Sequence, residues 1–169
     1  GKGEYSVALA DKYPQKNFIG VDIKGARIWK GATDSLSKKL TNIAFLRVRI
    51  EWIEHCFNSN EIDEIWITFP DPQLKFRRSS KRLTHPNFLK KYNKILNKTG
   101  VIHLKTDNNF LHAYTLGILD GQSHSIEYSS NDIYNADHLY EHLEIKTYYE
   151  QKYLEKGMPI TYVKFRLNY

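Results

Sequence analysis

The sequence contains a single cysteine, Cys56, among its 169 residues. One cysteine excludes a disulfide framework and a thiolate zinc site within the chain, and it fits a reducing compartment. We expect Cys56 to be a small buried hydrophobic residue, because no companion pattern of a catalytic thiol surrounds it. The chain also lacks the run of about 18 apolar residues that a membrane span needs, and no signal peptide opens it. These absences predict a cytoplasmic protein without a membrane segment.

The composition favours one globular domain with a polyanionic partner. Apolar residues make up 41% of the chain, which is enough for a buried core at this length. A formal net charge of +6 says nothing about the fold, but it favours a polyanion where the cations are clustered. Because the chain opens on Gly1 instead of methionine, we expect that an N-terminal piece with a first strand is missing.

Apolar runs of strand length alternate with segments of helical period. The strand candidates, rich in β-branched and aromatic residues, are 17–23, 43–50, 64–69 and 101–106. Amphipathic helical faces lie within 88–96 and 110–118, with a helix stop at 97–100. This alternation predicts an α/β fold with a mostly parallel sheet, to which the period-two run 159–167 adds an antiparallel strand. We expect a single domain over residues 1–169.

Ligands of such sheets bind beyond the carboxyl ends of the strands. The turn Gly1-x-Gly3 would let the backbone approach a cofactor, and Asp22, at the end of the next strand, is placed to accept hydrogen bonds from ribose hydroxyls. An ordinary turn with a helix-capping Asp22 stays open as the alternative. A nicotinamide fingerprint needs another glycine where Glu4 or Tyr5 stands, so the pattern disfavours a dehydrogenase.

The stretch FPDPQLKFRRSSKR, residues 69–82, follows the third predicted strand. Each proline pushes the residue before it, Phe69 or Asp71, towards extended geometry, so we expect Asp71 to be held rigidly at the strand end. Five cations then follow in eight residues, and their place beside the expected ligand cleft favours contacts with nucleic-acid phosphates over a merely solvated face. These cations are Lys75, Arg77, Arg78, Lys81 and Arg82.

Together with GVDIKGAR before it and HLKTDNNFL after it, this stretch resembles the bacterial tRNA (guanine-N7)-methyltransferases, a family with a Rossmann-like class I fold that uses S-adenosylmethionine. The resemblance extends to the TxxE pattern at Thr147 to Glu150. It implies tRNA as the partner and places Asp71 at the junction of cofactor and substrate. We expect Asp71 to be the catalytic residue and expect no metal. The implied cofactor site comprises Gly1, Gly3, Asp22, Ile50, Glu51 and Asp71, and the implied substrate site comprises Lys75, Asp107, Thr147 and Glu150.

The sequence departs from the family pattern in three places. The strand that carries the first acidic cofactor contact, before the glycine turn, is absent from these residues. Where many members carry an acid that reaches the adenine, this chain has Arg49, and backbone groups near Ile50 or the Glu51 carboxylate are the expected substitutes. The tryptophan often found after the second proline is Gln73 here.

Several of these residues also have a purely structural interpretation. Asp107 is expected to be the N-cap of the following helix, and a second role facing the substrate stays open. Thr147 and Glu150 have the spacing of a capping box, which from the residues alone is the preferred interpretation. Residues 138–142 fit HxxEH, a pattern of zinc ligands, but nothing supplies a third ligand, so we interpret it as chance. We expect Trp29, Trp52 and Trp66 to lie in the core, and His85 to start a helix.

Two functions of different classes remain open at this point. The leading hypothesis is an RNA methyltransferase, and the rival is a non-catalytic RNA-binding subunit with the same fold. A pure binder of polyanions gains nothing from four acids in one cleft, so Asp22, Asp71, Asp107 and Glu150 argue against the rival. Methylation of an adenine or cytosine amino group would call for an Asn/Asp-Pro-Pro-aromatic turn instead of FPDP. Monomer and homodimer stay open.

Overall fold

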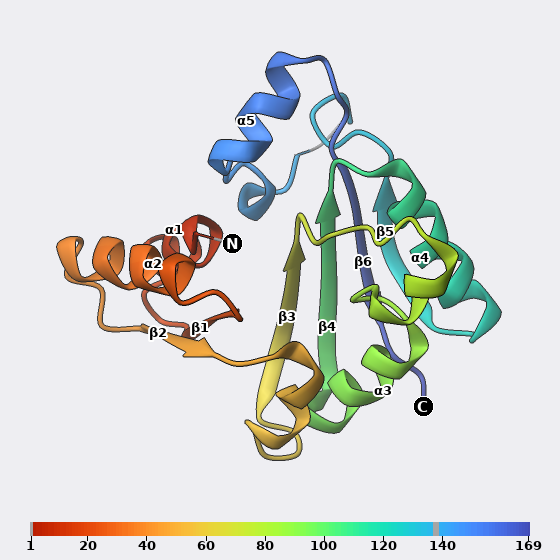
Figure 1. Ribbon diagram of the computed structural model, residues 1–169, viewed down its shortest axis with the longest axis horizontal. Coiled ribbons are helices and arrows are strands. Elements are labelled where there is room, and N and C mark those ends of the chain that lie inside the picture. The colour runs from red at the N-terminus through yellow and green to blue at the C-terminus, as the bar shows by residue number, and fades with distance from the viewer. Residues whose placement is uncertain (1, 137–138) are drawn as a thin grey trace. The chain divides into compact units, whose positions relative to one another are not determined.

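The computed structural model describes residues 2–136 and 139–169. The chain forms two compact units, which are Gly1–Ile53 with Tyr140–Gln151, and Glu54–Leu139 with Lys152–Tyr169. Each unit has its own sheet (Figure 1). None of the helices in the described residues has the length and apolar content that crossing a lipid bilayer requires.

The first unit contains a parallel two-stranded sheet, with register from Phe18↔Ile43 to Asp22↔Arg47. Its helices α1 and α2 contact both strands of that sheet. The elements in chain order are α1 (Glu4–Lys12), β1 (Phe18–Asp22), α2 (Gly25–Ser37), β2 (Ile43–Arg47), the start of the 3-10 helix η1 (Ile50–His55), the 3-10 helix η3 (Glu141–Leu143) and the start of α5 (Tyr148–Glu155).

The second unit contains a four-stranded sheet of order β3-β4-β6-β5. Strand β4 pairs in parallel with β3, and β6 pairs antiparallel with both β4 and β5. The elements in chain order are β3 (Ile62–Thr68), the 3-10 helix η2 (Phe76–Lys81), α3 (Pro86–Ile95), β4 (Leu96–Thr106), α4 (Asn109–Gly121), β5 (Ser125–Ser130) and β6 (Thr161–Arg166).

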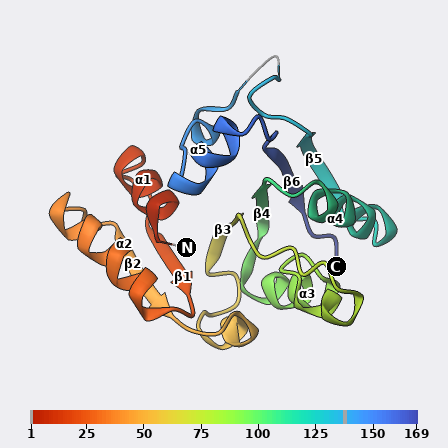
Figure 2. The ribbon, with the colours of Figure 1, turned by 45° about the horizontal axis from the view of Figure 1, so that its top comes forward.

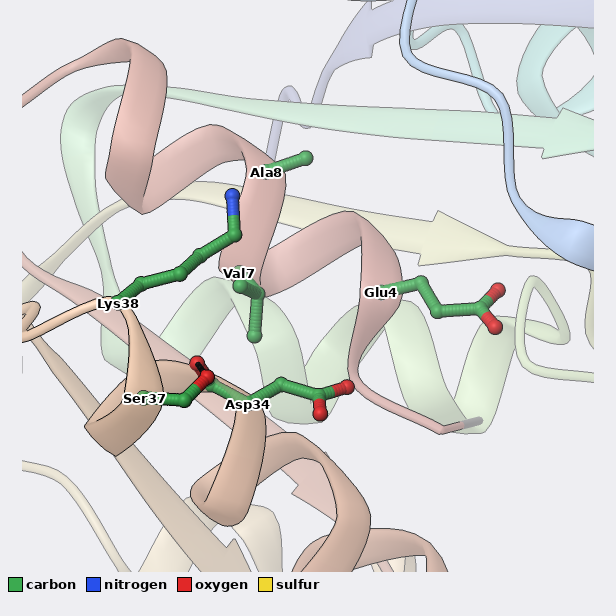
Figure 3. Close-up of a pocket in the computed structure, with 6 residues that line it drawn as sticks. All are labelled: Glu4, Val7, Ala8, Asp34, Ser37 and Lys38. Carbon is green, nitrogen blue, oxygen red and sulfur yellow. Dashed lines mark hydrogen bonds between the residues drawn. The ribbon is translucent and has the colours of Figure 1, made fainter.

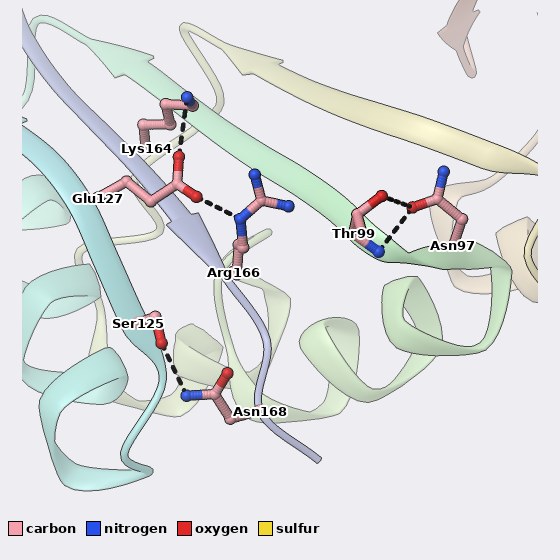
Figure 4. Close-up of polar contacts among 7 residues, drawn as sticks. All are labelled: Asn97, Thr99, Ser125, Glu127, Lys164, Arg166 and Asn168. Atoms are coloured by element: carbon pink, nitrogen blue, oxygen red, sulfur yellow. Dashed lines mark hydrogen bonds and ion pairs between the residues drawn. The ribbon is translucent and has the colours of Figure 1, made fainter.

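The core of this second unit lies under α3 and α4, which cover one face of the four-stranded sheet (Figures 1 and 2). Register pairs Ile102 with Phe165 and Leu104 with Val163, so four fully buried apolar side chains share that face. Burial of this kind contributes about 1.5 to 3 kcal/mol for each large apolar side chain. On β5 and β6, Glu127 forms ion pairs with Lys164 and Arg166 and so ties the sheet edge together (Figure 4).

The predicted alternation of strands and helices is confirmed, with parallel pairs β1–β2 and β3–β4 and an antiparallel C-terminal strand β6. Two strand boundaries differ from the prediction by three residues or more. Strand β2 ends at Arg47, before Ile50, and β4 begins at Leu96 because the expected helix stop is an irregular part of the strand. There the Asn97 side chain accepts a hydrogen bond from the Thr99 N–H at 2.9 Å (Figure 4).

Three expectations of burial are wrong. Cys56 is exposed, because it follows η1 in a connecting segment. Trp29 is 68% exposed, since α2 buries Gly31 and Ser35 on its other side, and Trp52 is 58% exposed on η1. Trp66 is half-buried and stacks on His103 with ring centroids 3.9 Å apart. A place in a helical or strand period therefore does not by itself show that a tryptophan is buried.

Candidate active site

Asp71 and Asp107 follow neighbouring parallel strands of the second unit. Strands β3 and β4 pair up to Thr68↔Lys105, so the segments after both strands leave the sheet at the same edge. Asp71 is exposed, and Asp107 is partly buried. The structure thus brings two of the predicted site acids to one end of one sheet.

The segment 69–73, here called the Asp71 loop, has an unusual backbone. Phe69 has a φ of 49° and Gln73 a φ of 47°, values that residues other than glycine rarely adopt. The expectation that Pro70 makes Phe69 extended is therefore wrong, and the Phe69 N–H instead donates to the Lys105 carbonyl at 2.8 Å. The Asp71 carboxylate accepts a hydrogen bond from the Gln73 N–H at 2.9 Å. The Asp71 loop is therefore held by a backbone hydrogen bond to β4 and by this turn, and its rigidity stays a prediction.

Asp107 does not cap the helix that follows it. The N-cap of α4 is Asn108, whose side-chain oxygen accepts from the Leu111 N–H at 2.9 Å. The prediction that Asp107 is the N-cap is wrong, because the helix starts one residue later. Burial raises the pKa of the Asp107 carboxyl above its ordinary value. A partly buried acid without a capping role is a good candidate for contact with a ligand.

Residues 75–82, here called the basic segment, continue from the Asp71 loop into η2. Lys75, Arg77, Arg78 and Lys81 are exposed, as phosphate contacts require. Phe76 lies among them with 92% of its surface exposed. An aromatic ring between solvated cations suits a partner that has both phosphates and bases.

Arg82 does not have the exposure that the expected contact with a phosphate requires. Its side chain is only 5% exposed, and its guanidinium donates hydrogen bonds to the carbonyls of Pro72 and Gln73. A buried guanidinium that is committed to backbone oxygens cannot meet a phosphate. The exposed cations of the basic segment therefore number four instead of five.

In the first unit, Gly3 and Asp22 have the local geometry expected of them. Gly3 begins α1 with a φ of 80°, and a Cβ there would lie 2.8 Å from the Gly31 Cα, so only glycine fits. Asp22 ends β1 and accepts from the Lys24 N–H at 2.8 Å, with Arg27 at 3.5 Å. The N-cap of α2 is Lys24, so Asp22 shapes the turn without capping the helix. Gly1 lies outside the described residues.

Ile50 and Glu51 open η1 after β2. The Val48 N–H donates to the Asp22 carbonyl at 3.2 Å, which ties this segment to the end of β1. Glu51 is exposed, and its carboxylate lies 3.4 Å from the Arg49 guanidinium. Both residues therefore lie near the strand end that carries Asp22, within the same unit.

Thr147 and Glu150 form the capping box that their spacing predicts. The Glu150 N–H donates to Thr147 Oγ1 and the Thr147 N–H donates to Glu150 Oε2, both at 3.3 Å. Glu150 is fully buried. The structural interpretation is confirmed, and the contact of these residues with a substrate stays a prediction. His85 is likewise confirmed as a helix start, because it is the N-cap of α3.

Two other features of the first unit do not form a site. A hollow between α1 and α2, lined by Glu4, Val7, Ala8, Asp34, Ser37 and Lys38, has its charged groups occupied (Figure 3). Asp34 pairs with Lys30 at 2.8 Å, and Glu4 accepts from the Tyr148 N–H at 2.9 Å. In the HxxEH segment, His138 lies outside the described residues and Glu141–Leu143 form one short 3-10 turn. Within residues 2–136 and 139–169, no group of three His, Cys, Asp or Glu is placed to hold a metal ion.

Comparison with known proteins points to the same family as the resemblance seen in the sequence. A family described as "Putative methyltransferase" matches residues 1–163. A tRNA (guanine-N(7)-)-methyltransferase of Christiangramia forsetii is 53% identical over 99% of this chain and 75% of its own length. The chain belongs to the tRNA (guanine-N(7)-)-methyltransferase family. A relative of the same name from Bacteroides thetaiotaomicron is 49% identical over 99% of this chain, which spans 66% of that protein.

Solved structures confirm the fold class of this family member. A 30S ribosomal A1408 methyltransferase from an uncultured bacterium has a TM-score of 0.67 at 17% identity, covering 99% of this chain and 84% of that one. A SAM-dependent methyltransferase from Aquifex aeolicus has a TM-score of 0.66 at 12% identity, covering 98% of this chain and 77% of that one. At such identities the likeness concerns the fold alone.

Proposed function

We propose that this chain is the methyltransferase part of an enzyme that transfers a methyl group from S-adenosylmethionine to N7 of a guanine in tRNA, in the variable loop by family resemblance. The observation that carries the proposal is the Asp71 loop, which leads into four exposed cations in a chain 53% identical to a tRNA (guanine-N(7)-)-methyltransferase. We further propose that both units belong to one methyltransferase domain, and that the enzyme works in the cytoplasm.

The chemistry of the residues in the first unit fits S-adenosylmethionine. Asp22 supplies a carboxylate acceptor at a strand end, where ribose hydroxyls are bound in related folds. Gly3, with Gly1 before it, supplies a glycine turn at the start of α1, and Ile50 and Glu51 are the proposed contacts of the adenine. When bound, the cofactor supplies an electrophilic methyl group on a positively charged sulfur.

Guanine N7 needs no general base. Its in-plane lone pair remains an open acceptor in a Watson-Crick pair, so no proton has to leave before the methyl group is attacked. The protein has to orient the guanine and offset the positive charge that develops on the purine. In this proposal the Asp71 carboxylate, held by the Gln73 N–H, provides that negative charge.

The remaining acids select guanine over adenine. Asp107 and Glu150 are the proposed acceptors for the N1 and N2 edge of guanine, which presents hydrogen-bond donors where adenine presents a different pattern. Thr147 and Lys75 complete the substrate contacts. The capping role of Glu150 is compatible with this one, because a carboxylate offers about four acceptor positions.

The basic segment is the proposed binding surface for the RNA backbone. Lys75, Arg77, Arg78 and Lys81 contact phosphates and position the tRNA without reading its sequence. Phe76 is exposed in their midst, so we propose that it stacks on an unpaired base.

The test is to incubate the full-length protein with isotope-labelled S-adenosylmethionine and bulk tRNA, and to identify the modified nucleoside after digestion. Labelled 7-methylguanosine is the expected product. Tight tRNA binding without any transfer of label would favour the non-catalytic RNA-binding subunit. Label on an adenine or cytosine amino group would contradict the assignment of N7.

A further inference from the structure

Arg82 is a buried cation between the Asp71 loop and α4. Its Nε lies 3.3 Å from the carbonyl oxygens of both Pro72 and Gln73, and its Nη2 lies 3.1 Å from the Gln73 oxygen. The guanidinium carbon is 4.8 Å from the ring centre of Phe110 and 4.4 Å from that of Tyr114. One side chain thus holds two consecutive carbonyls of the loop and two aromatic faces of the helix.

This arrangement differs from an ordinary structural ion pair. Within the part of the chain that the structure describes, no carboxylate lies at ion-pair distance from the Arg82 guanidinium. A buried charge is costly unless hydrogen bonds and polarisable groups replace its water. Here carbonyl dipoles and ring faces do so, and only the planar fork of arginine can reach both at once.

The carbonyls that Arg82 binds flank the strained end of the loop. Gln73 has a φ of 47°, which costs free energy unless the surroundings hold it. The N–H of the same residue is the donor that orients the Asp71 carboxylate. Arg82 therefore holds the peptide from which Asp71 takes its hydrogen bond.

A second contact joins α4 to Thr84, which follows the basic segment. Thr84 Oγ1 and Thr115 Oγ1 are fully buried and lie 2.7 Å apart. Helix α4 starts at Asn109, two residues after Asp107. The Asp71 loop and the segment that carries Asp107 are thus joined through one helix. In Figure 1 the chain after β3 runs across the sheet towards α4.

We infer that Arg82 is a positioning residue, which clamps the Asp71 loop onto α4 and so fixes the Asp71 carboxylate at the edge that also carries Asp107. It acts through backbone oxygens and touches no RNA phosphate. The catalytic consequence rests on the proposed function, whereas the clamp itself does not.

Amide exchange of the full chain tests the clamp without any reaction. In Arg82→Met, NMR should show the Gln73 amide exchanging with water at least about tenfold faster than in the wild type, because the peptide is no longer held. The matched control is Arg78→Met, which removes an exposed arginine of the same segment and should leave that amide unchanged. Equal exchange of the Gln73 amide in wild type and Arg82→Met would overturn the inference.

Single-turnover methyl transfer at saturating tRNA and S-adenosylmethionine tests the consequence. Arg82→Met should lower the rate by about tenfold to 100-fold, as a small displacement of a catalytic group does. Its tRNA affinity should keep the wild-type salt dependence, whereas Arg78→Met should weaken that dependence. A wild-type rate in Arg82→Met, or a salt dependence weakened as in Arg78→Met, would overturn the positioning role.

A second variant serves if Arg82→Met does not fold. Phe110 and Tyr114 are partly exposed, so the double variant Phe110→Leu, Tyr114→Leu removes the aromatic faces and keeps the arginine. It should show the same two changes, and their absence would overturn the inference. If the wild type itself transfers no methyl group, the proposed function fails, and the exchange of Gln73 still decides the clamp.

Discussion

The salt dependence of tRNA binding should show four phosphate contacts, one from each exposed cation of the basic segment. Each phosphate contact releases condensed counterions and adds about 0.7 to 0.9 to the slope of log K against log salt. Lys75, Arg77, Arg78 and Lys81 are exposed and Arg82 is buried, so replacing the four by Gln should reduce the slope by about 2.8 to 3.6. Replacing Arg82 in addition should reduce the slope no further, whereas a fifth phosphate contact at Arg82 would add about 0.7 to 0.9 to the reduction.

The difference in slope between the wild type and the four-residue variant is large enough to measure by fluorescence anisotropy with labelled tRNA. Between about 50 and 200 mM KCl, the wild type should lose about 50- to 150-fold more affinity than the four-residue variant. The matched control replaces four exposed lysines outside the segment by Gln, which removes the same charge. These are Lys39, Lys90, Lys94 and Lys98.

Two results would refute the reasoning. Equal slopes in the variant and the control would mean that net charge, and not the basic segment, sets the salt dependence. A smaller slope in Arg82→Met alone would mean that this guanidinium leaves its carbonyl partners to meet phosphate, contrary to its burial.

Four further predictions follow from the proposed site. Asp71→Asn should lower single-turnover transfer by about 10² to 10³ and leave tRNA affinity unchanged, and the wild-type rate should stay flat from about pH 7 to 9; a rate rising steeply with pH would indicate a general base. Asp22→Ala should weaken S-adenosylmethionine binding in calorimetry by about 1.5 to 3 kcal/mol, and equal affinity would leave Asp22 only its turn. Burial raises the pKa of the Asp107 carboxyl, so its contribution to folding stability falls as pH rises from the ordinary pKa of Asp through the raised one. Asp107→Asn should therefore raise Tm at pH 7 and lower methyl transfer, and a lower Tm would contradict this. Asn108→Ala should instead lower the free energy of unfolding by about 0.5 to 2 kcal/mol, because it removes the N-cap of α4. Phe76→Ser should weaken tRNA binding by about 1 to 3 kcal/mol at an unchanged salt slope, and a changed slope would speak against stacking.

Local signals predicted much of the fold and part of the site. The order of strands and helices follows from hydrophobic periodicity, and the capping box of Thr147 and Glu150 follows from a spacing of three residues. Asp71 was singled out because ligands of parallel sheets bind beyond the carboxyl ends of the strands, whereas the substrate contact of Asp107 was implied by the family resemblance alone. Strand β5 was missed because its residues, Ser125–Ser130, are polar and mostly exposed, and its order comes from backbone pairing with β6.

Other features depend on partners that are distant in sequence. Arg82 looks like its four basic neighbours, and only the carbonyls of Pro72 and Gln73 and the rings on α4 make it a buried clamp. The left-handed backbone of Phe69 runs against the preference before proline, and no glycine or asparagine marks it. Sequence patterns carry no sign of such contacts, because tertiary structure overrides the local preference at these positions.

The way in which Arg82 holds the Asp71 loop bears on how this segment can change during evolution. Arg82 donates hydrogen bonds to backbone oxygens, which every amino acid has, so these contacts do not depend on which side chain stands at position 73. Another side chain can therefore replace Gln73 without loss of these contacts, provided that the backbone there accepts a positive φ. A change of side chain at position 73 leaves the contacts between Arg82 and the loop intact, whereas replacing Arg82 removes its contacts with two carbonyls and two rings.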